Sequence, residues 1–335
     1  MKKKRKMKRV FKTVCLIAMV GLVAVSCKKK EDRAEYAVNF GETYGFQAGP
    51  SLDGSKAYFD PYDGYKFKWN VGDEVVIYNL ATDHTQSTCE VFSAMNAGQE
   101  SMFMGKPVGA RKDIGYFVFY NAEKAHRDLK EFNTETFEVK RTQTYDPACL
   151  ADPTAIVAAC TTGENNGEPS TFSVQHIFGY LNVAIGGLSE GVTVDSIVVT
   201  DNQWNLTGQL DLRLPQVNSE EFNTLLGYLK NYQEDEYTAA LNTYLHQLGY
   251  HAHGNQTKSI KLDCGGAAVP YLQWQYFFVC LRPGALYKGF SVDIYLKGNN
   301  GNNHLHRDFA PSINWLIEPA KFNNIFIGTD GQVYG

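Results

Sequence analysis

The chain has 335 residues, of which 44% are hydrophobic and 20% charged, so it is long enough for two packed domains and is ordinary in composition for a globular protein. Its net charge of −4 includes eight basic residues and no acid within residues 1–26; without that segment 24 basic and 36 acidic residues remain, a net charge near −12. Such an acidic chain lacks the basic surface that neutralises phosphates, and we expect no nucleic-acid partner.

Residues 1–26 have the organisation of a secretory signal peptide. Lys and Arg crowd residues 2–12, residues 14–25 are apolar, and Ser26 precedes Cys27. Twelve apolar residues span about 18 Å as a helix, less than the hydrocarbon core of about 30 Å, which favours a cleaved signal over an uncleaved transmembrane anchor. Residues 24–27 (AVSC) resemble the lipobox of bacterial lipoproteins. That resemblance implies cleavage between Ser26 and Cys27 and lipid attachment at Cys27.

The lipid on Cys27 would hold the protein to a membrane, because several acyl chains anchor far more firmly than one. We therefore expect an exported, lipid-anchored protein of the outer membrane, facing either the periplasm or the cell surface. The charged residues 27–33 (CKKKEDR) are interpreted as a lipidated tether. The alternative is a cleaved signal that leaves Cys27 as an ordinary thiol.

Beyond the tether, short runs rich in Val, Ile, Tyr, Phe and Thr alternate with Gly, Asn, Asp and Pro, which is typical of antiparallel strands. In the run 290–296, Phe290, Val292, Ile294 and Leu296 fall on one face of a strand. Strands are expected at 36–46, 74–78, 89–94, 101–104, 116–120, 137–139, 155–159, 171–185, 192–199, 208–212, 259–262, 271–281, 289–296 and 321–327. Because strands do not alternate with helices, an all-β fold of sandwiches is predicted and a parallel nucleotide-binding sheet is not.

One segment has a helical pattern. Asn218 and Glu221 are spaced as a capping box, apolar residues follow at helical spacing, and Gly249 is placed to end a second helix. We expect a helical insertion at about 218–249, which either caps one end of a sandwich or forms a partner-binding surface. The polar, Gly-bearing run 163–170 is the best linker, and it divides the chain into an N-terminal sandwich, 34–163, and a C-terminal sandwich with the insertion, 164–335.

Cysteine and histidine give no clear site. Of seven cysteines, Cys15 lies in the signal and Cys27 is the lipid site, so five remain, without a CxxC motif, and cannot all pair within one chain. Cys280 lies in an apolar run and is interpreted as a buried thiol, while a Cys149–Cys160 disulfide stays open. The pairs His251/His253 and His304/His306 could each face one ion from a strand, but each lies in a Gly/Asn-rich segment with no evident third ligand. We interpret them as loop histidines and expect neither metal nor cofactor.

At this point the chain resembles the fimbrillin-like (Mfa-like) lipoproteins of Bacteroidetes. The resemblance runs over most of residues 34–330, in the order of its motifs. These are WNVGDEVVIY at 69–78, GYFVFY at 115–120, RTQTY at 141–145, FSVQHIFGYL at 172–181, VDSI at 194–197, LTG at 206–208 and FVCLRPG at 278–284. The resemblance implies two transthyretin-like β-sandwich domains in tandem, a lipidated precursor, and assembly with other fimbrial subunits by strand addition.

Two departures from the polymerising members of that family shape the functional prediction. Their precursors are cut after an Arg in the loop that follows the first strand, whereas here residues 46–78 contain only Lys56, Lys66 and Lys68 as basic residues. The sequence also ends soon after the expected strand 321–327, with no long extra strand to donate. A tip, anchor or accessory role in adhesion or fimbrial assembly is therefore favoured over a polymerising stalk.

Glycan binding and enzymatic activity are the two other functions to compare with this prediction. The alternative is a glycan-binding surface lipoprotein of a polysaccharide-uptake system, in which some of Trp69, Trp204, Trp274 and Trp315 would stack on sugars, although such residues more often belong to a core. Enzyme motifs are absent from the sequence, and we expect no catalytic residues. The one carboxylate cluster of interest is Asp60, Asp63 and Asp73 beside Trp69.

Overall fold

The structure, a computed structural model, describes residues 44–48, 58–60, 66–79, 88–98, 100–105, 116–120, 134–155, 158–161, 171–172, 174–213, 253–318 and 321–334. All of them belong to one unit, Ala37–Gly335. Among these residues every regular element is a strand except a single turn of 3-10 helix, η1 (Ile313–Trp315), which confirms the expected all-β class. The signal peptide, Cys27, the linker 163–170 and the helical segment 218–249 lie outside the described residues.

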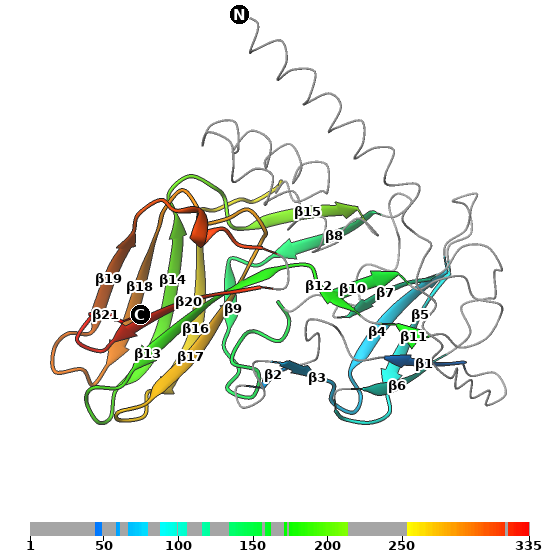
Figure 1. Ribbon diagram of the computed structural model, residues 1–335, viewed down its shortest axis with the longest axis horizontal. Helices are drawn as coiled ribbons and strands as arrows, with labels where there is room; N and C mark the ends of the chain where they lie inside the picture. Colours follow the sequence, from blue (N-terminus) through cyan, green and yellow to red (C-terminus); the bar gives the residue numbers. More distant parts are fainter. Residues whose placement is uncertain are drawn as a thin grey trace, which may run out of the picture. The chain divides into compact units, whose positions relative to one another are not determined.

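An eight-stranded sheet is built mainly from the first half of the chain (Figure 1). Its pairs are antiparallel except for β1–β11, which is parallel. In spatial order its strands are β11 (Thr171–Phe172), β1 (Tyr44–Ala48), β6 (Ser101–Gly105), β5 (Thr88–Ala94), β4 (Glu74–Asn79), β7 (Tyr116–Tyr120), β10 (Ala158–Thr161) and β12 (Gln175–His176).

Two further sheets form a sandwich built mainly from the second half of the chain (Figure 1). The four-stranded sheet has the order β17 (Trp274–Leu281), β13 (Gly179–Gly186), β20 (Phe322–Gly328) and β21 (Val333–Tyr334). The five-stranded sheet has the order β19 (His304–Phe309), β18 (Phe290–Lys297), β14 (Thr193–Asp201), β16 (Ser259–Ala268) and β9 (Thr142–Thr144). Two antiparallel two-stranded sheets complete the set, β2 (Tyr58–Asp60) with β3 (Lys66–Lys68), and β8 (Thr134–Val139) with β15 (Gly208–Arg213).

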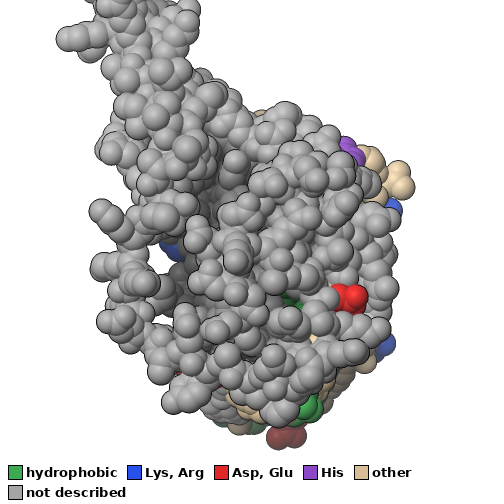
Figure 2. Space-filling view, turned by 90° about the vertical axis from the view of Figure 1, so that its right-hand side faces the viewer, with side chains coloured by type: hydrophobic (Ala, Val, Ile, Leu, Met, Phe, Trp, Pro, Cys, Tyr) green, Lys and Arg blue, Asp and Glu red, His purple; other side chains and the backbone are tan. Residues whose placement is uncertain are grey.

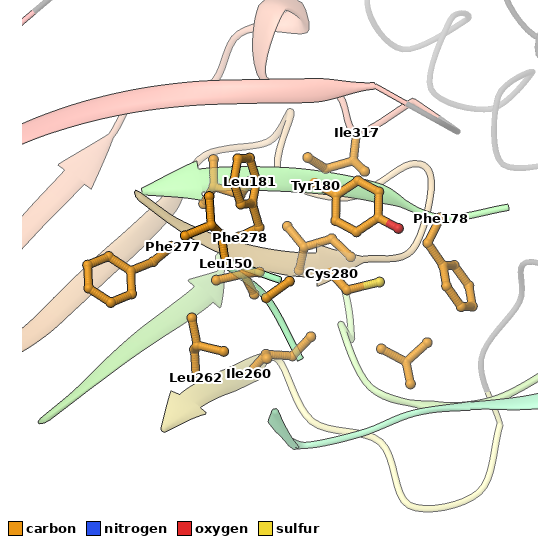
Figure 3. Close-up of a cluster of buried hydrophobic side chains, with 14 of the residues drawn as sticks. Leu150, Phe178, Tyr180, Leu181, Ile260, Leu262, Phe277, Phe278, Cys280 and Ile317 are labelled. Atoms are coloured by element: carbon orange, nitrogen blue, oxygen red, sulfur yellow. The ribbon is translucent and has the colours of Figure 1, made fainter. Parts of the chain in front are cut away.

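The core of this sandwich lies where the inward side chains of the two sheets meet. Strand β18 alternates as its sequence predicts, with Phe290, Val292, Ile294 and Leu296 buried and the residues between them half-buried or exposed. The central strand β13 is buried along its whole length because it has neighbours on both sides and is covered on both faces. Figure 3 shows the cluster between the sheets, which includes Leu150, Phe178, Tyr180, Leu181, Ile260, Leu262, Phe277, Phe278, Cys280 and Ile317. Each large apolar side chain buried there contributes roughly 1.5–3 kcal/mol to folding.

Strand pairing crosses residue 163, where the sequence predicts a boundary between domains. Strands β8 and β9 precede that residue, yet they pair with β15 and β16. Strands β11 and β12 follow it, yet they pair with β1 and β10. The division into 34–163 and 164–335 stays a prediction. Each of the two segments contributes strands that pair with strands of the other segment.

Most strands lie close to their predicted positions, but some predicted strands are divided or begin later, and some observed strands were not predicted. The predicted run 171–185 is three strands, β11, β12 and β13, and the predicted strand 155–159 begins later, at Ala158. Strands β2, β3, β9, β19 and β21 were not predicted, since β2, β3, β9 and β21 have only two or three residues each and the outward side chains of β19 are polar. Three pairs are parallel, β1–β11, β9–β16 and β13–β20, although only antiparallel pairing was expected. In the described part of the chain, no helix has the length and apolar character to cross a bilayer.

Candidate functional site

One edge of the four-stranded sheet is closed by residues from elsewhere in the chain. The side chain of Gln143, fully buried on β9, donates from Nε2 to the carbonyl oxygen of Cys280 at 2.8 Å and accepts from its backbone N–H at 3.0 Å. Next along β17, the N–H of Phe278 donates to the carbonyl oxygen of Leu150 at 2.8 Å. These bonds satisfy the backbone groups of β17 that an added strand would otherwise use.

The opposite edge is only partly covered. Strand β20 pairs in parallel with β13 from Phe322 to Gly328, but on its other side β21 pairs only with Phe326 and Ile327. Within the residues that the structure describes, no strand lies beside Asn323–Ile325 on that outer side. A sheet edge of this kind can accept a strand from another molecule, because its backbone donors and acceptors face outward.

Exposed apolar side chains gather at the end of this sheet where β21 lies. Five of the eight exposed large hydrophobic residues in the described part of the chain are here, and we call them the apolar end: Leu188, Tyr271, Leu272, Val333 and Tyr334.

Short contacts bring the members of the apolar end together. The backbone of Gly187 pairs with Tyr271, and its carbonyl oxygen accepts from the N–H of Leu272 at 2.6 Å. Leu188 and Tyr334 flank Gly328 so closely that a Cβ there would lie 3.1 Å from Leu188 Cδ1 and 2.7 Å from Tyr334 Cε2. The half-buried ring of Trp274 lies 5.9 Å from that of Tyr334, centroid to centroid. Clustered exposed apolar residues are typical of interaction surfaces, whereas scattered ones are ordinary.

The backbone holds Leu272 outward in a strained conformation. Its φ of +56° lies in the left-handed region, and its side chain is 70% exposed. A non-glycine residue there costs of order 1–3 kcal/mol, and such strain is concentrated at functional positions. The hydrogen bonds from Leu272 N–H to Gly187 and from Gln273 N–H to Pro270 (3.2 Å) maintain the turn. The backbone strain at Leu272 thus accompanies a leucine side chain that is exposed to solvent.

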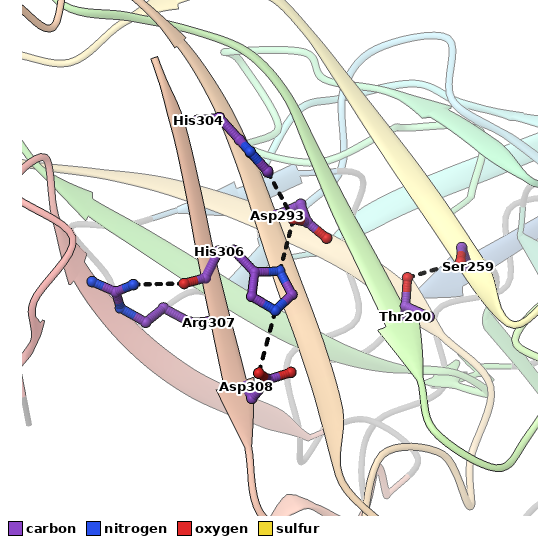
Figure 4. Close-up of polar contacts among 7 residues, drawn as sticks. All are labelled: Thr200, Ser259, Asp293, His304, His306, Arg307 and Asp308. Carbon is purple, nitrogen blue, oxygen red and sulfur yellow. Dashed lines mark hydrogen bonds and ion pairs between the residues drawn. The ribbon is translucent and has the colours of Figure 1, made fainter. Parts of the chain in front are cut away.

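A polar cluster lies on the outer face of the five-stranded sheet (Figure 4). Oδ1 of Asp293 on β18 is 2.8 Å from Nε2 of His304 and 2.8 Å from Nδ1 of His306, both on β19. Nε2 of His306 is 3.3 Å from Oδ2 of Asp308. The hydrogen bond that the imidazole of His306 donates to Asp293 is the main reason that the pKa of His306 is raised. The interpretation of His304 and His306 as loop histidines is therefore wrong, since both lie on a strand, share one face and have a carboxylate between them.

The surface hollow of about 600 Å³ offers no evident catalytic constellation. It is open, and it is lined by Glu138, Val139, Arg141, Thr207 and residues 254–257. Its one carboxylate, Glu138, has no second acid or histidine beside it in that lining. Of the carboxylate cluster singled out in the sequence, Asp63 and the side chain of Asp60 lie outside the described residues, and burial raises the pKa of Asp73.

The cysteines that the structure describes with their side chains are all buried: Cys149, Cys264 and Cys280. Burial is the main cause that raises the pKa of the Cys149 thiol to about 12, and it raises the pKa of Cys264 and Cys280 further. Thiols of this kind are not nucleophiles at neutral pH. Cys280 is buried as predicted, whereas the Cys149–Cys160 disulfide stays open, because the side chain of Cys160 lies outside the described residues.

The four tryptophans do not form one platform. Trp69 is buried, with edge-to-face contacts to Phe103 (4.8 Å between ring centroids) and Tyr120 (5.3 Å). Trp204 and Trp315 are half-buried against the core, and Trp274 is half-buried. On the face shown in Figure 2, the described side chains of each chemical type appear only in small separate groups. The apolar end and the His/Asp cluster are therefore the two surface features with a defined constellation of residues.

Comparisons with known proteins give similar folds but no family assignment. No protein-family model matches the chain, and no curated protein matches its sequence. Two similar structures are each named "putative cell adhesion protein": one from Bacteroides ovatus has 10% identity, a TM-score of 0.48 and coverage of 79% of this chain and 85% of its own. The other, from Bacteroides uniformis, has 14% identity, a TM-score of 0.47 and coverage of 79% and 90%.

A third similar structure is the tip fimbrial protein Mfa3 from Porphyromonas gingivalis, with 9% identity, a TM-score of 0.37 and coverage of 85% of this chain and 95% of its own. These three similar structures are thus of adhesion and fimbrial proteins from Bacteroides and Porphyromonas species. Identity to these three structures is at most 14%, and each TM-score is below 0.5.

Proposed function

We propose that this protein is a lipid-anchored subunit of the cell envelope that acts in adhesion or fimbrial assembly, as a tip, anchor or accessory component. The anchor is the lipid on Cys27, after cleavage between Ser26 and Cys27, and it supports an outer-membrane location. The partners are the membrane and other fimbrial subunits. An acidic mature chain does not suit nucleic acid as a further partner.

The observation that carries the assembly role is the apolar end beside a partly covered sheet edge. Val333 and Tyr334 belong to the two-residue strand β21, so these two exposed side chains and the open part of β20 lie on one edge of one sheet. Leu188, Tyr271 and Leu272 lie at the same end of that sheet, beside β13 and β17. A partner strand along Asn323–Ile325 would gain backbone hydrogen bonds, and apolar side chains next to it would supply the desolvated contact that most binding energy needs. By contrast, the edge at β17 is already occupied by Gln143 and Leu150.

A non-enzymatic role is supported by the chemistry of the described surface. Its hollow lacks an acid–base pair, and its thiols are buried with raised pKa values. Catalysis needs convergent groups with tuned protonation states in a cleft, and the described residues that line this hollow do not supply them.

A glycan-binding role remains the second candidate, and one observation favours it. Tyr271, Trp274 and Tyr334 lie at the same end of the four-stranded sheet, and Tyr271 and Tyr334 are exposed. Aromatic rings with one wet side are suited to contact with the apolar faces of sugars. This candidate predicts binding of a purified polysaccharide that depends on the rings alone, so Tyr271→Ala and Tyr334→Ala would abolish it and Leu272→Asp would not.

The assembly role is tested with Leu272→Asp combined with Tyr334→Asp, expressed in the producing bacterium. We expect the amount of protein in the outer-membrane fraction to be unchanged, because both side chains are exposed and the core is untouched. Cell adhesion and the slowly migrating assemblies on unheated gels should fall at least about tenfold, since central apolar contacts are worth about 2 kcal/mol or more.

The matched control is Val71→Asp, because Val71 is as exposed (68%) as Leu272 but lies in the turn before β4, away from the apolar end. It should leave adhesion and assembly unchanged. Equal adhesion by the parent, the control and the double variant would contradict the assembly role of the apolar end.

A further inference from the structure

The His/Asp cluster on β18 and β19 has the donor set of a metal site. The strand register places Asp293 directly opposite His306, and His304 is two residues before His306 on the same face. All three donor atoms face one another, because Nε2 of His304 and Nδ1 of His306 both lie 2.8 Å from the same carboxylate oxygen. Two histidines at i and i+2 with a carboxylate on the neighbouring strand bring N, N and O ligands to one point of a sheet face.

The carboxylate of Asp308 contacts the ring nitrogen of His306 that faces away from Asp293. Oδ2 of Asp308 lies 3.3 Å from Nε2 of His306, on the opposite side of the ring from Asp293. In metal sites a ligating histidine commonly donates its other N–H to a carboxylate, which fixes the tautomer and makes the ligating nitrogen more basic. Here the same arrangement would leave Nδ1 of His306 free to bind an ion while Nε2–H donates to Asp308.

Ring stacking and exposure allow the cluster to accept an ion without disturbing the core. The ring of His304 stacks on Tyr295 at 4.8 Å between centroids and 9° between planes, which holds its orientation. The side chains of His304 and His306 are about half exposed, and Asp293 retains some exposure, so these groups can adjust by rotation.

We propose that His304 Nε2, His306 Nδ1 and the Asp293 carboxylate bind one divalent transition-metal ion of the zinc type, with water completing the coordination. Zn²⁺ takes nitrogen and oxygen ligands at about 2.0–2.2 Å in a tetrahedral arrangement. In the described structure the Asp293 oxygen lies between the two imidazoles, and the described residues contain no group of three ligands already set around a common centre. Binding therefore requires the carboxylate to turn aside so that the ion replaces its two hydrogen bonds.

A bound ion at this place would clamp an edge strand. Strand β19 is at the end of the five-stranded sheet and pairs only with β18 among the described strands. An ion bonded to both strands would resist separation of β19 from β18, and it would stabilise the native state because the unfolded chain does not hold these ligands together.

The test is isothermal titration of the detergent-solubilised mature protein with ZnCl2. We expect the parent to bind Zn²⁺ and the double variant His304→Gln, His306→Gln to lose that site, with affinity at least about 100-fold lower. Asp308→Asn should weaken binding about tenfold, the usual size of an outer-shell effect. His253→Gln is the matched control, an exposed histidine outside the cluster, and it should bind as the parent does.

A spectroscopic readout separates this site from the cysteines. Co²⁺ in place of Zn²⁺ should give the visible spectrum of a nitrogen and oxygen site without a thiolate charge-transfer band, and the double variant should lose that spectrum. Equal Zn²⁺ affinity in the parent and the folded double variant, or a thiolate band with Co²⁺, would overturn the proposal.

Discussion

Replacing Asp201 with Ala is expected to lower the free energy of unfolding by about 3–5 kcal/mol, the range for breaking a buried charged network. Asp201 is fully buried, and its Oδ1 accepts from the N–H groups of Gln203 (2.8 Å) and Trp204 (2.7 Å). Its Oδ2 accepts from the N–H of Leu286 at 2.7 Å, which ties the turn after β14 to the segment after β17. The variant would leave the backbone N–H groups of Gln203, Trp204 and Leu286 without this acceptor at a position that is buried from solvent.

A nearby buried guanidinium adds to the expected loss. Arg282 is buried, and burial lowers its pKa while the charge of Asp201 raises it. Removing Asp201 takes away that favourable charge. Asp201→Asn, which keeps one carbonyl oxygen but no charge, should fall between the parent and Asp201→Ala in urea denaturation. A loss below about 1 kcal/mol for Asp201→Ala would show that the carboxylate does not hold these turns.

Replacing Gln143 with Ala should cost about 1–3 kcal/mol for each of the two Cys280 backbone groups that it leaves without a partner. Gln143 is fully buried and is the link between β9 in one sheet and β17 in the other. The amide of Cys280 should also exchange its hydrogen faster, because the variant reopens the edge of β17. Urea denaturation and hydrogen exchange measure the two effects.

Gln275→Ala is the matched control for this prediction. Gln275 is half-buried at the other end of β17 and makes one described hydrogen bond, from Nε2 to the hydroxyl of Tyr145 at 2.7 Å. Its loss should cost only about 0.5–1.5 kcal/mol. If both variants were equally stable, or if exchange at Cys280 were unchanged in Gln143→Ala, Gln143 would not be what closes this edge.

Strands that bury one face could be predicted from local sequence. The alternation from Phe290 to Leu296 identifies β18 because every second side chain enters the core. Strand β19 could not be predicted from such alternation, because it buries only Leu305 and exposes His304, His306 and Asp308 to solvent. The strand order also follows from contacts that local sequence does not contain, such as the parallel pairing of β13 with β20.

The candidate sites depend on this long-range pairing. Nothing near His304 in the sequence identifies Asp293 as a neighbour, because the contact exists only in the register of β18 with β19. The apolar end likewise joins Leu188, Leu272 and Tyr334, which come from three distant turns and strands. A positive φ at an exposed leucine has no sequence signature. The lipid site is the opposite case, since the motif around Cys27 is purely local and lies outside the described residues.

The most direct test of the central claim, an anchored subunit of the cell envelope, is the intact mass and membrane fractionation of the native protein beside a Cys27→Ala variant. We expect a mature chain that begins at Cys27, carries added acyl mass and is found in the outer-membrane fraction, and a variant that lacks the acyl mass and the anchoring. A soluble, unacylated product that is the same with and without Cys27 would contradict it.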